Sequence, residues 1–123
     1  MTYEEYDEEM HRLFSAAFAI RCNTDSNDED LHEADKYIDD ALSLSSEMEV
    51  ANNDEDIQHE IINDRLRCYI ERLAIYTRLL KNAYNTPQFD AISEKHEHYC
   101  NRYMNVYSHI NYEEIKQIGR AHV

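Results

Sequence analysis

Apolar residues recur every three or four positions along most of this chain, which is the spacing that lines one side of an α-helix. The first series predicts a helix over residues 2–22, with Thr2 as its N-cap and Glu5 as the capping-box partner. The residues expected on its buried side are Tyr3, Tyr6, Met10, Leu13, Phe14, Ala17 and Ile20. The polar residues 23–28 then form a linker, because they favour turns and helix caps.

Two further series follow, and Asn52 and Asn53 separate them. The second predicted helix covers residues 29–50, with inward residues Leu31, Ala34, Ile38, Ala41, Leu42, Ser45 and Met48. The third runs from Asp54 to Tyr84, and its inward stripe of Ile62, Leu66, Tyr69, Leu73, Tyr76 and Leu80 is flanked by Ile61, Ile70 and Leu79. This apolar surface is broad, so the third helix is expected at the centre of a bundle. Its basic residues are expected on the remaining surface: Arg65, Arg67, Arg72, Arg78 and Lys81.

The only proline, Pro87, restarts the chain for a fourth helix, since proline is tolerated in a first turn but not inside a helix. The inward residues of this helix are Phe89, Ile92, His96, Tyr99, Tyr103, Val106 and Ile110. Asn111 is expected to cap a short fifth helix over residues 112–118, which Gly119 ends. A chain with one glycine and one proline cannot supply the turns of hairpins and barrels or a phosphate-binding loop. The prediction is a single all-α domain over residues 1–123, an up-down bundle of four long helices plus a short C-terminal helix.

Charge changes this picture, because the formal net charge is -14 and the acidic residues are concentrated in one half of the chain. Residues 1–64 contain 20 acidic and 3 basic residues, whereas residues 65–123 contain 6 acidic and 9 basic residues. An acidic surface repels phosphate, so direct binding to nucleic acid or to an anionic membrane is not expected. It favours a basic protein partner, because opposite charges steer two proteins together.

The second predicted helix carries the acidic residues that local structure explains least. Its outward side is expected to hold Asp28, Asp35 and Asp39, with Glu33 and Asp40 beside them and Lys36 as the one compensating cation. Like charges four residues apart destabilise a helix by about 0.2–0.5 kcal/mol, so neutralising Asp35, Asp39 and Asp40 should stabilise the free protein and slow its association. The residues predicted to bind the partner are Glu29, Asp30, Glu33, Asp35, Tyr37, Asp39, Asp40, Asp54, Glu55 and Asp56. Four tyrosines fit the inward positions least well and are further interface candidates: Tyr37, Tyr84, Tyr107 and Tyr112.

No cofactor, metal or catalytic group is predicted, and an enzyme is not expected. One glycine leaves no nucleophile elbow or nucleotide-binding loop. The three cysteines have apolar or aromatic neighbours and are expected to be inert packing residues. One alternative is kept: His96 and Cys100 share a side of the fourth predicted helix, and Cys68 or Cys22 could complete a zinc site with them.

The leading interpretation is a small acidic, non-enzymatic protein that blocks a basic site on a partner such as a nuclease, a toxin or a nucleic-acid-binding complex. Bacteriocin-type immunity proteins and phage inhibitors of the anti-CRISPR or anti-restriction kind work in this way, and the phage inhibitors present carboxylates where phosphates would lie. The N-terminal sequence MTYEEYDEEM lacks a signal-peptide pattern and no apolar run reaches the about 18 residues of a membrane span, so a cytoplasmic location without membrane contact is expected. The alternatives are a structural bundle that self-associates by pairing its acidic and mildly basic halves, and a metal-binding bundle. The oligomeric state is not predicted.

Overall fold

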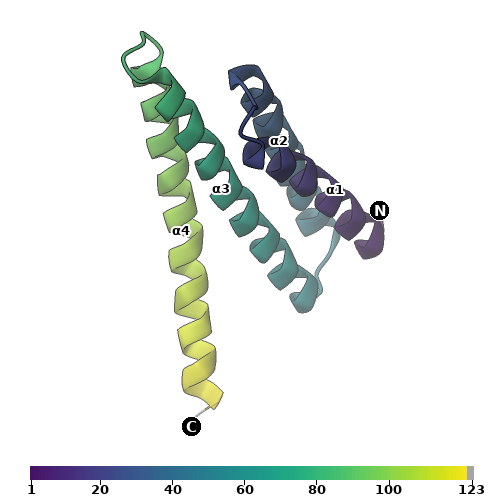
Figure 1. The fold of residues 1–123 in the computed structure, drawn as a ribbon. Coiled ribbons are helices and arrows are strands. Elements are labelled where there is room, and N and C mark those ends of the chain that lie inside the picture. The colour runs from purple at the N-terminus through teal and green to yellow at the C-terminus, as the bar shows by residue number, and fades with distance from the viewer. Residues whose placement is uncertain (122–123) are drawn as a thin grey trace.

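The computed structural model describes residues 1–121, with side chains for residues 1–108, and the regular structure in that range is entirely helical. Its elements are α1 (Tyr3–Cys22), α2 (Asp28–Ala51), α3 (Glu55–Ala83) and α4 (Phe89–Ala121) (Figure 1). The predicted all-α class and the four long helices are confirmed.

The predicted short fifth helix is not found, because α4 continues through residues 112–118 and past Gly119 to Ala121. A glycine inside a helix costs only about 1 kcal/mol relative to alanine, which is too little to end a long helix by itself. The predicted roles of Ile110, Asn111 and Tyr112 concern side chains that lie outside residues 1–108, for which side chains are described.

Polar side chains start three of the helices by binding the free backbone amides of the first turn. Thr2 accepts a hydrogen bond from the Glu5 amide at 3.1 Å, as predicted. Asn27 and Asp30 form a reciprocal capping box at the start of α2, and Asp54 accepts bonds from two amides at the start of α3. Part of the acidic content of the chain is therefore used locally, as caps and at the positive ends of helix dipoles.

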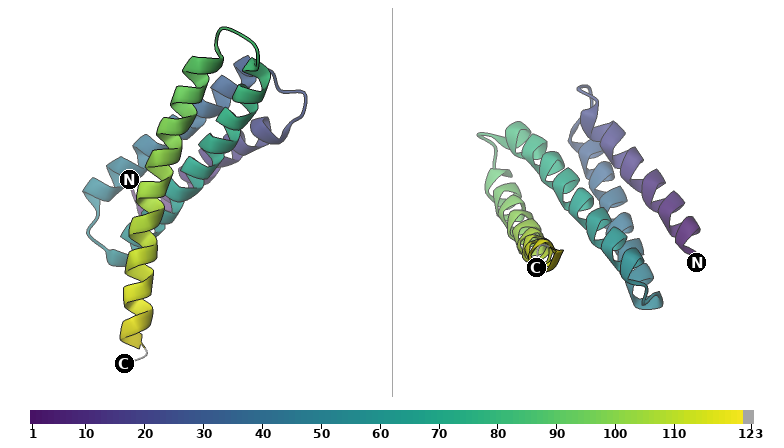
Figure 2. Two further views of the ribbon diagram at one scale, coloured as in Figure 1. Left: turned by 90° about the vertical axis from the view of Figure 1, so that its left-hand side faces the viewer. Right: turned by 90° about the horizontal axis from the view of Figure 1, so that it is seen from below.

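The central helix is α3, which packs against α1, α2 and α4, while α1 and α2 also pack against each other. Figures 1 and 2 show α4 on the side of α3 that faces away from α1, and the connections between consecutive helices lie at alternating ends of the molecule. In the described residues α4 has no direct packing with α1 or α2. None of the helices in this part of the chain combines the length and the apolar content that a membrane span requires.

Burial follows the predicted pattern on α1 and α2 more closely than on α3. On α1 the buried residues are Tyr6, Met10, Leu13 and Ala17, and on α2 all but one of the predicted inward residues are buried, joined by the unpredicted Leu44. The exception is Leu42, which is partly exposed. On α3, Ile70 is half exposed and Arg72 is buried, so the predictions for these two residues are wrong. Asp64 and Glu71, which had no predicted position, are also buried.

The turn between α3 and α4 is tight. Asn85 has a φ of 61°, in the left-handed region that asparagine adopts more readily than most residues. The Thr86 amide then donates to the Ala83 carbonyl at 2.9 Å. This turn sends α4 back along α3, where Tyr99 packs against Tyr76 at a ring distance of 5.1 Å.

Candidate protein-binding surface

An acidic row follows the solvent side of α2. Glu29, Glu33, Asp40 and Glu47 are all exposed and are spaced so that they lie on one line of the helix. These four residues are called the outer stripe below. Lys36 lies within the row, and Arg12 of α1, which is bonded to Glu9, has its pKa raised first by Glu9 and to a lesser degree by Asp40. Glu29, Glu33 and Asp40 were predicted here from sequence.

Asp35 and Asp39 both pair with a residue of α3. Arg72 Nε donates to Asp35 Oδ1 at 2.7 Å, and the Tyr76 hydroxyl donates to Asp35 Oδ2 at 3.1 Å. The second guanidinium arm of Arg72 pairs with Asp39. A helix turns by about 100° per residue, so Asp35 lies roughly 120° away from Glu29 around the axis. The prediction that Asp35 projects outward is therefore wrong, whereas Asp39 is exposed as predicted but pairs with Arg72.

Arg72 itself is buried, although it was expected on the surface of α3. Its guanidinium lies 4.6 Å from the centre of the Tyr99 ring on α4, so one side chain connects α2, α3 and α4. Burial acts to lower the pKa of Arg72, but Asp35 and Asp39 outweigh this effect and the pKa is raised. Burial and Asp35 also raise the pKa of Tyr76, which stays a neutral hydrogen-bond donor. These contacts, called the Arg72 network below, make Asp35 a structural residue.

Similar pairs join α1 to α3. Arg21 binds Glu71 through two hydrogen bonds of 2.6 and 2.9 Å. Asp64 accepts a bond from the Tyr6 hydroxyl at 2.8 Å and another from Arg67 at 2.6 Å. Burial and the bond to Asp64 raise the pKa of the Tyr6 hydroxyl. Every arginine of α1 and α3 thus binds a carboxylate or backbone carbonyl of the same chain: Arg12, Arg21, Arg65, Arg67, Arg72 and Arg78.

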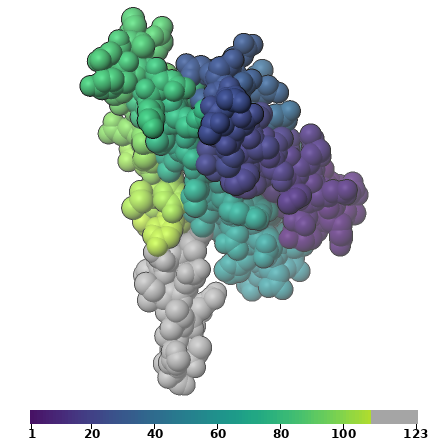
Figure 3. Space-filling view, in the orientation of Figure 1, coloured from purple at the N-terminus to yellow at the C-terminus, as the bar shows by residue number. Residues whose placement is uncertain are grey.

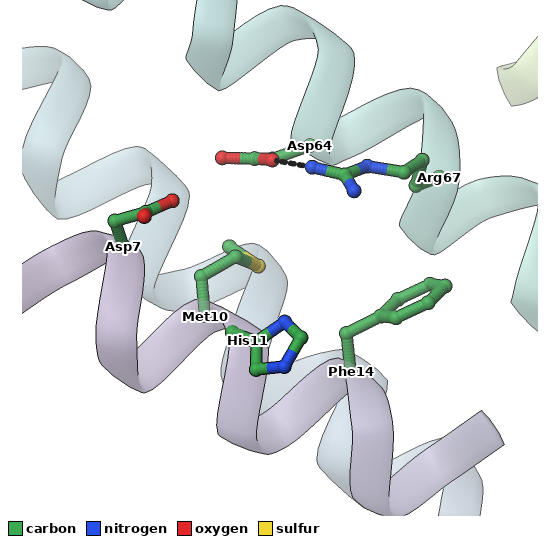
Figure 4. A pocket seen from close by; sticks show the side chains of 6 residues that line it. All are labelled: Asp7, Met10, His11, Phe14, Asp64 and Arg67. Carbon is green, nitrogen blue, oxygen red and sulfur yellow. Dashed lines mark hydrogen bonds and ion pairs between the residues drawn. The ribbon is translucent and has the colours of Figure 1, made fainter. Parts of the chain in front are cut away.

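A small hollow lies between α1 and α3 beside the Asp64–Arg67 pair (Figure 4). Its volume is about 160 Å³, and it is lined by Asp7, Met10, His11, Phe14, Asp64 and Arg67. Small-molecule sites usually measure about 300–1,000 Å³. The hollow is therefore too small for an ordinary organic substrate.

A second acidic area forms where the starts of α1 and α3 meet. The Tyr6 hydroxyl of α1 donates to Asp64 in the first half of α3 at 2.8 Å, and burial, followed by the carboxylates of Asp7, Glu60 and Asp64, raises the pKa of Tyr3. Figure 3 shows the surface of α1 (purple) beside that of the α2–α3 turn and the start of α3 (teal). The exposed carboxylates of this area are Glu4, Glu5, Asp7, Glu8, Asp54, Glu55, Asp56 and Glu60, and together they are called the acidic end.

The acidic end was predicted only in part. Asp54, Glu55 and Asp56 were named from sequence, whereas the carboxylates of α1 had been explained by the helix dipole alone. The signal that could have revealed them is the presence of two helix starts that are both rich in acidic residues. Tyr37 and Asp30, also predicted partner residues, are partly buried; Tyr37 packs against the core and Asp30 caps α2.

A groove that sequence reasoning missed runs between α2 and α4, with α3 as its floor. Its volume is about 800 Å³, and its lining includes Leu42, Ser43, Tyr69, Tyr99 and Arg102. Two further arginines border it, but Arg65 pairs with Glu49 and Arg72 with Asp35 and Asp39. The groove is therefore close to neutral and offers no concentrated positive charge to an anion.

The histidine and cysteine candidates form only a pair. His96 Nδ1 lies 3.8 Å from Cys100 Sγ, and its other ring nitrogen lies 3.4 Å from the Thr77 hydroxyl. In the described part of the chain, no group of three histidine, cysteine or acidic side chains is arranged to hold a metal ion.

The three cysteines are not equivalent. Burial raises the pKa of the Cys68 thiol to about 12, as expected for a packing residue. Cys100 is partly exposed. Cys22 is exposed, contrary to the prediction, because it ends α1 where the core no longer covers it.

The exposed tyrosines Tyr84 and Tyr107 lie away from the outer stripe, on the α3–α4 turn and on α4. The outer stripe and the acidic end consist of exposed carboxylates on the surfaces of α1, α2 and α3. No protein-family model matches this chain, and no curated protein or solved structure matches it either.

Proposed function

We propose that this protein is a non-enzymatic inhibitor that binds a basic protein partner through the outer stripe and the acidic end, and so blocks a site that the partner uses for nucleic acid. The observation that carries the proposal is the division of the carboxylates. Arginines of α1 and α3 hold Asp35, Asp64 and Glu71 inside the fold. Of the exposed carboxylates, twelve belong to the outer stripe and the acidic end, and the others are spread over the α1–α2 turn, the α3-facing side and the end of α2, and α4.

The spacing of these carboxylates supports a surface made of both areas. From Glu29 to Glu47 the outer stripe spans about 27 Å at 1.5 Å per residue. Its four carboxylates are sparser than the phosphates of duplex DNA, which carry one charge per about 1.7 Å of axis. A match to a phosphate-binding site therefore requires the acidic end as well, where the starts of two helices add further carboxylates.

One observation supports binding rather than catalysis. The buried titratable groups near the α1–α3 hollow already bind one another, as Tyr6 and Asp64 do. For location we propose the cytoplasm, because the free thiols suit a reducing compartment. Self-association by pairing an acidic with a basic half has less support, because the arginines of α3 that would supply the basic surface bind groups of their own chain.

A pair of matched variants tests the proposal. The triple variant Glu29→Gln, Glu33→Gln, Asp40→Asn neutralises three residues of the outer stripe. The control Asp90→Asn, Glu94→Gln, Glu97→Gln neutralises the same residue types at exposed positions of α4. Immobilised wild-type protein and the control should retain the same basic nucleic-acid-binding proteins from a cognate lysate, and the stripe variant should lose them. Added duplex DNA or RNA should release the bound proteins, and so should salt.

Two results would contradict the proposed function. The first is equal retention by the stripe variant and by the control. The second is a retained partner that binds nucleic acid and this protein at the same time, because the two would then occupy different sites.

A further inference from the structure

A second surface, on the side formed by α1, α3 and α4, contains three stripes of uncharged residues and is bordered by Arg21, Arg67 and Arg78. Three helical stripes with spacings of three and four residues compose it. They are Phe14, Phe18 and Cys22 on α1, Ile70, Ala74 and Thr77 on α3, and His96, Cys100, Met104 and Tyr107 on α4. These residues are called the uncharged face below, and none of them is acidic or a lysine or arginine.

Contacts between the helices place the three stripes side by side. A hollow of about 510 Å³ is lined by Arg21 and Cys22 of α1, by Thr24, and by Ala74, Thr77 and Arg78 of α3. Thr77 in turn lies 3.4 Å from His96 of α4. Because residues four apart lie above one another on a helix, each stripe continues from these contacts along the same side of the molecule.

Large apolar side chains are exposed on all three helices of this face. The exposed fraction is 46% for Phe18, 50% for Ile70, 53% for Met104 and 42% for Tyr107. Arg21 lies 5.0 Å over the Phe18 ring and helps to fix it in place. An exposed apolar patch rimmed by polar groups is the usual mark of an interaction site, and fixed aromatic anchors lose little entropy on binding.

We propose that two copies of this chain pair through the uncharged face, about a two-fold axis. Charge indicates where on the surface a second copy can bind. A second copy also has a net charge of -14, so its outer stripe or acidic end would repel those of the first. Beside the uncharged face, Arg21 and Arg67 are paired with Glu71 and Asp64 of the same chain, and Arg78 binds backbone carbonyls. The three stripes themselves contain no carboxylate. Two copies can therefore meet here without opposed carboxylates.

The size and symmetry of the face fit such a pair. Helices packed about 8–10 Å apart make three helices roughly 25 Å wide, and the length of α1 adds about 30 Å along the axis. The resulting area of roughly 750 Å² is near the about 800 Å² that each partner contributes to a stable interface. A two-fold axis places the same patch on both copies, and an apolar patch is complementary to itself.

Sedimentation equilibrium of the full chain, from about 1 to 500 µM, tests this proposal. The double variant Ile70→Gln, Met104→Gln should weaken the dimer at least about tenfold. The matched control Val50→Gln, Tyr84→Gln changes two other exposed apolar residues and should leave it unchanged. Phe18→Gln provides an independent variant on another helix. Circular dichroism checks that each variant keeps its helical content.

Two measurements, the salt dependence and the stripe variant, distinguish this dimer from the proposed binding of a basic partner. Raising NaCl from about 50 to 500 mM should strengthen the dimer by screening like charges, whereas it should weaken binding of a basic partner. The triple stripe variant Glu29→Gln, Glu33→Gln, Asp40→Asn should dimerise at least as well as the wild type. A monomer at every concentration and salt would overturn the proposal, even if another protein bound the face. So would a dimer that the Ile70 and Met104 substitutions leave intact, or one that the stripe variant dissociates.

Discussion

Asp35 and Asp40 belong to the same helix, but only Asp35 is held by an arginine. Arg72 and Tyr76 of α3 bind both oxygens of Asp35, and its side chain is 14% exposed. Asp40 lies on the opposite side of α2, in the outer stripe. The direction in which a position points around the helix axis therefore decides whether its carboxylate stabilises the fold or remains at the surface.

The same difference separates Asp64 and Glu71 from the acidic end. Both are buried and bound by arginines, although they belong to the same chain segment as the exposed Glu60. The charge imbalance between the two halves of the sequence is consequently not a map of the surface, because each inner carboxylate neutralises an arginine within the fold. The difference between the carboxylates that arginines hold in the fold and those at the surface leads to four predictions.

Removing Arg72 should have the largest effect. Arg72→Ala leaves Asp35 partly buried without its cation and exposes one side of the Tyr99 ring, so we expect a loss of about 3–5 kcal/mol in the free energy of unfolding. Urea denaturation followed by circular dichroism measures it. Arg102→Ala, at an exposed position of α4, is the control and should change stability by less than about 0.5 kcal/mol. Equal losses in both variants would show that the Arg72 network does not hold the helices together.

Asp35→Asn and Asp40→Asn test the comparison within one helix. The amide at position 35 keeps the shape but loses the charge-assisted bond, so we expect a loss of about 1–3 kcal/mol. Asp40→Asn should lie within about 0.5 kcal/mol of wild type. Similar free energies of unfolding in the two variants would show that Asp35 contributes no more to the fold than Asp40 does. The expected sign for Asp35 is opposite to that predicted from sequence, where the residue was treated as part of a repulsive row.

The parts of the structure that depend on neighbours in the sequence were predictable. Thr2 and Asp54 cap helices because of their own chemistry and that of the next few residues. The buried stripe of α1 follows from the helical period alone. These features give the all-α class and the four long helices, but they contain no information on which sides of two helices meet.

The Arg72 network could not be predicted for that reason. Asp35 and Arg72 are far apart in the sequence, and their pairing depends on how α2 and α3 are rotated against each other. Glu29, Glu33 and Asp40 of the outer stripe could be predicted, because an exposed side chain does not depend on the packing of another helix. The joining of the acidic end across α1 and α3, like the neutral groove, again depended on packing between helices.

Cys68 extends the comparison to a buried group that stays neutral. Burial, and secondarily Asp64, raises the pKa of its thiol from 9.0 to about 12. Above pH 9 the unfolded chain releases this proton while the folded chain retains it, so stability is complete below pH 9 and falls as the pH rises towards 12. The expected slope is up to about 1.4 kcal/mol per pH unit.

A pH series of urea denaturation from 8 to 11 measures this slope. Cys68→Ala should be less stable at pH 8 and should have a shallower slope, while the exposed Cys22→Ala should match wild type. The raised pKa values of Tyr6 and Tyr76 leave part of the slope in both variants. If Cys68→Ala had the same slope as wild type, the fold would not raise the pKa of the Cys68 thiol.

The smallest effect belongs to the outer stripe. Glu29 and Glu33 repel each other across four residues, but Glu29 also lies in the first turn of α2, where the helix dipole favours a negative charge, and Lys36 lies three residues from Glu33 and four from Asp40. Because these terms oppose one another, the triple variant Glu29→Gln, Glu33→Gln, Asp40→Asn should change the free energy of unfolding by less than about 0.5 kcal/mol. Thermal melts at low salt and at about 150 mM salt measure it, with Asp90→Asn, Glu94→Gln, Glu97→Gln as the control. Lost retention of a basic partner at unchanged stability would show that these carboxylates serve binding and not the fold. A loss of stability of about 1 kcal/mol or more in the stripe variant would instead place Glu29, Glu33 and Asp40 with Asp35, as carboxylates that the fold itself uses.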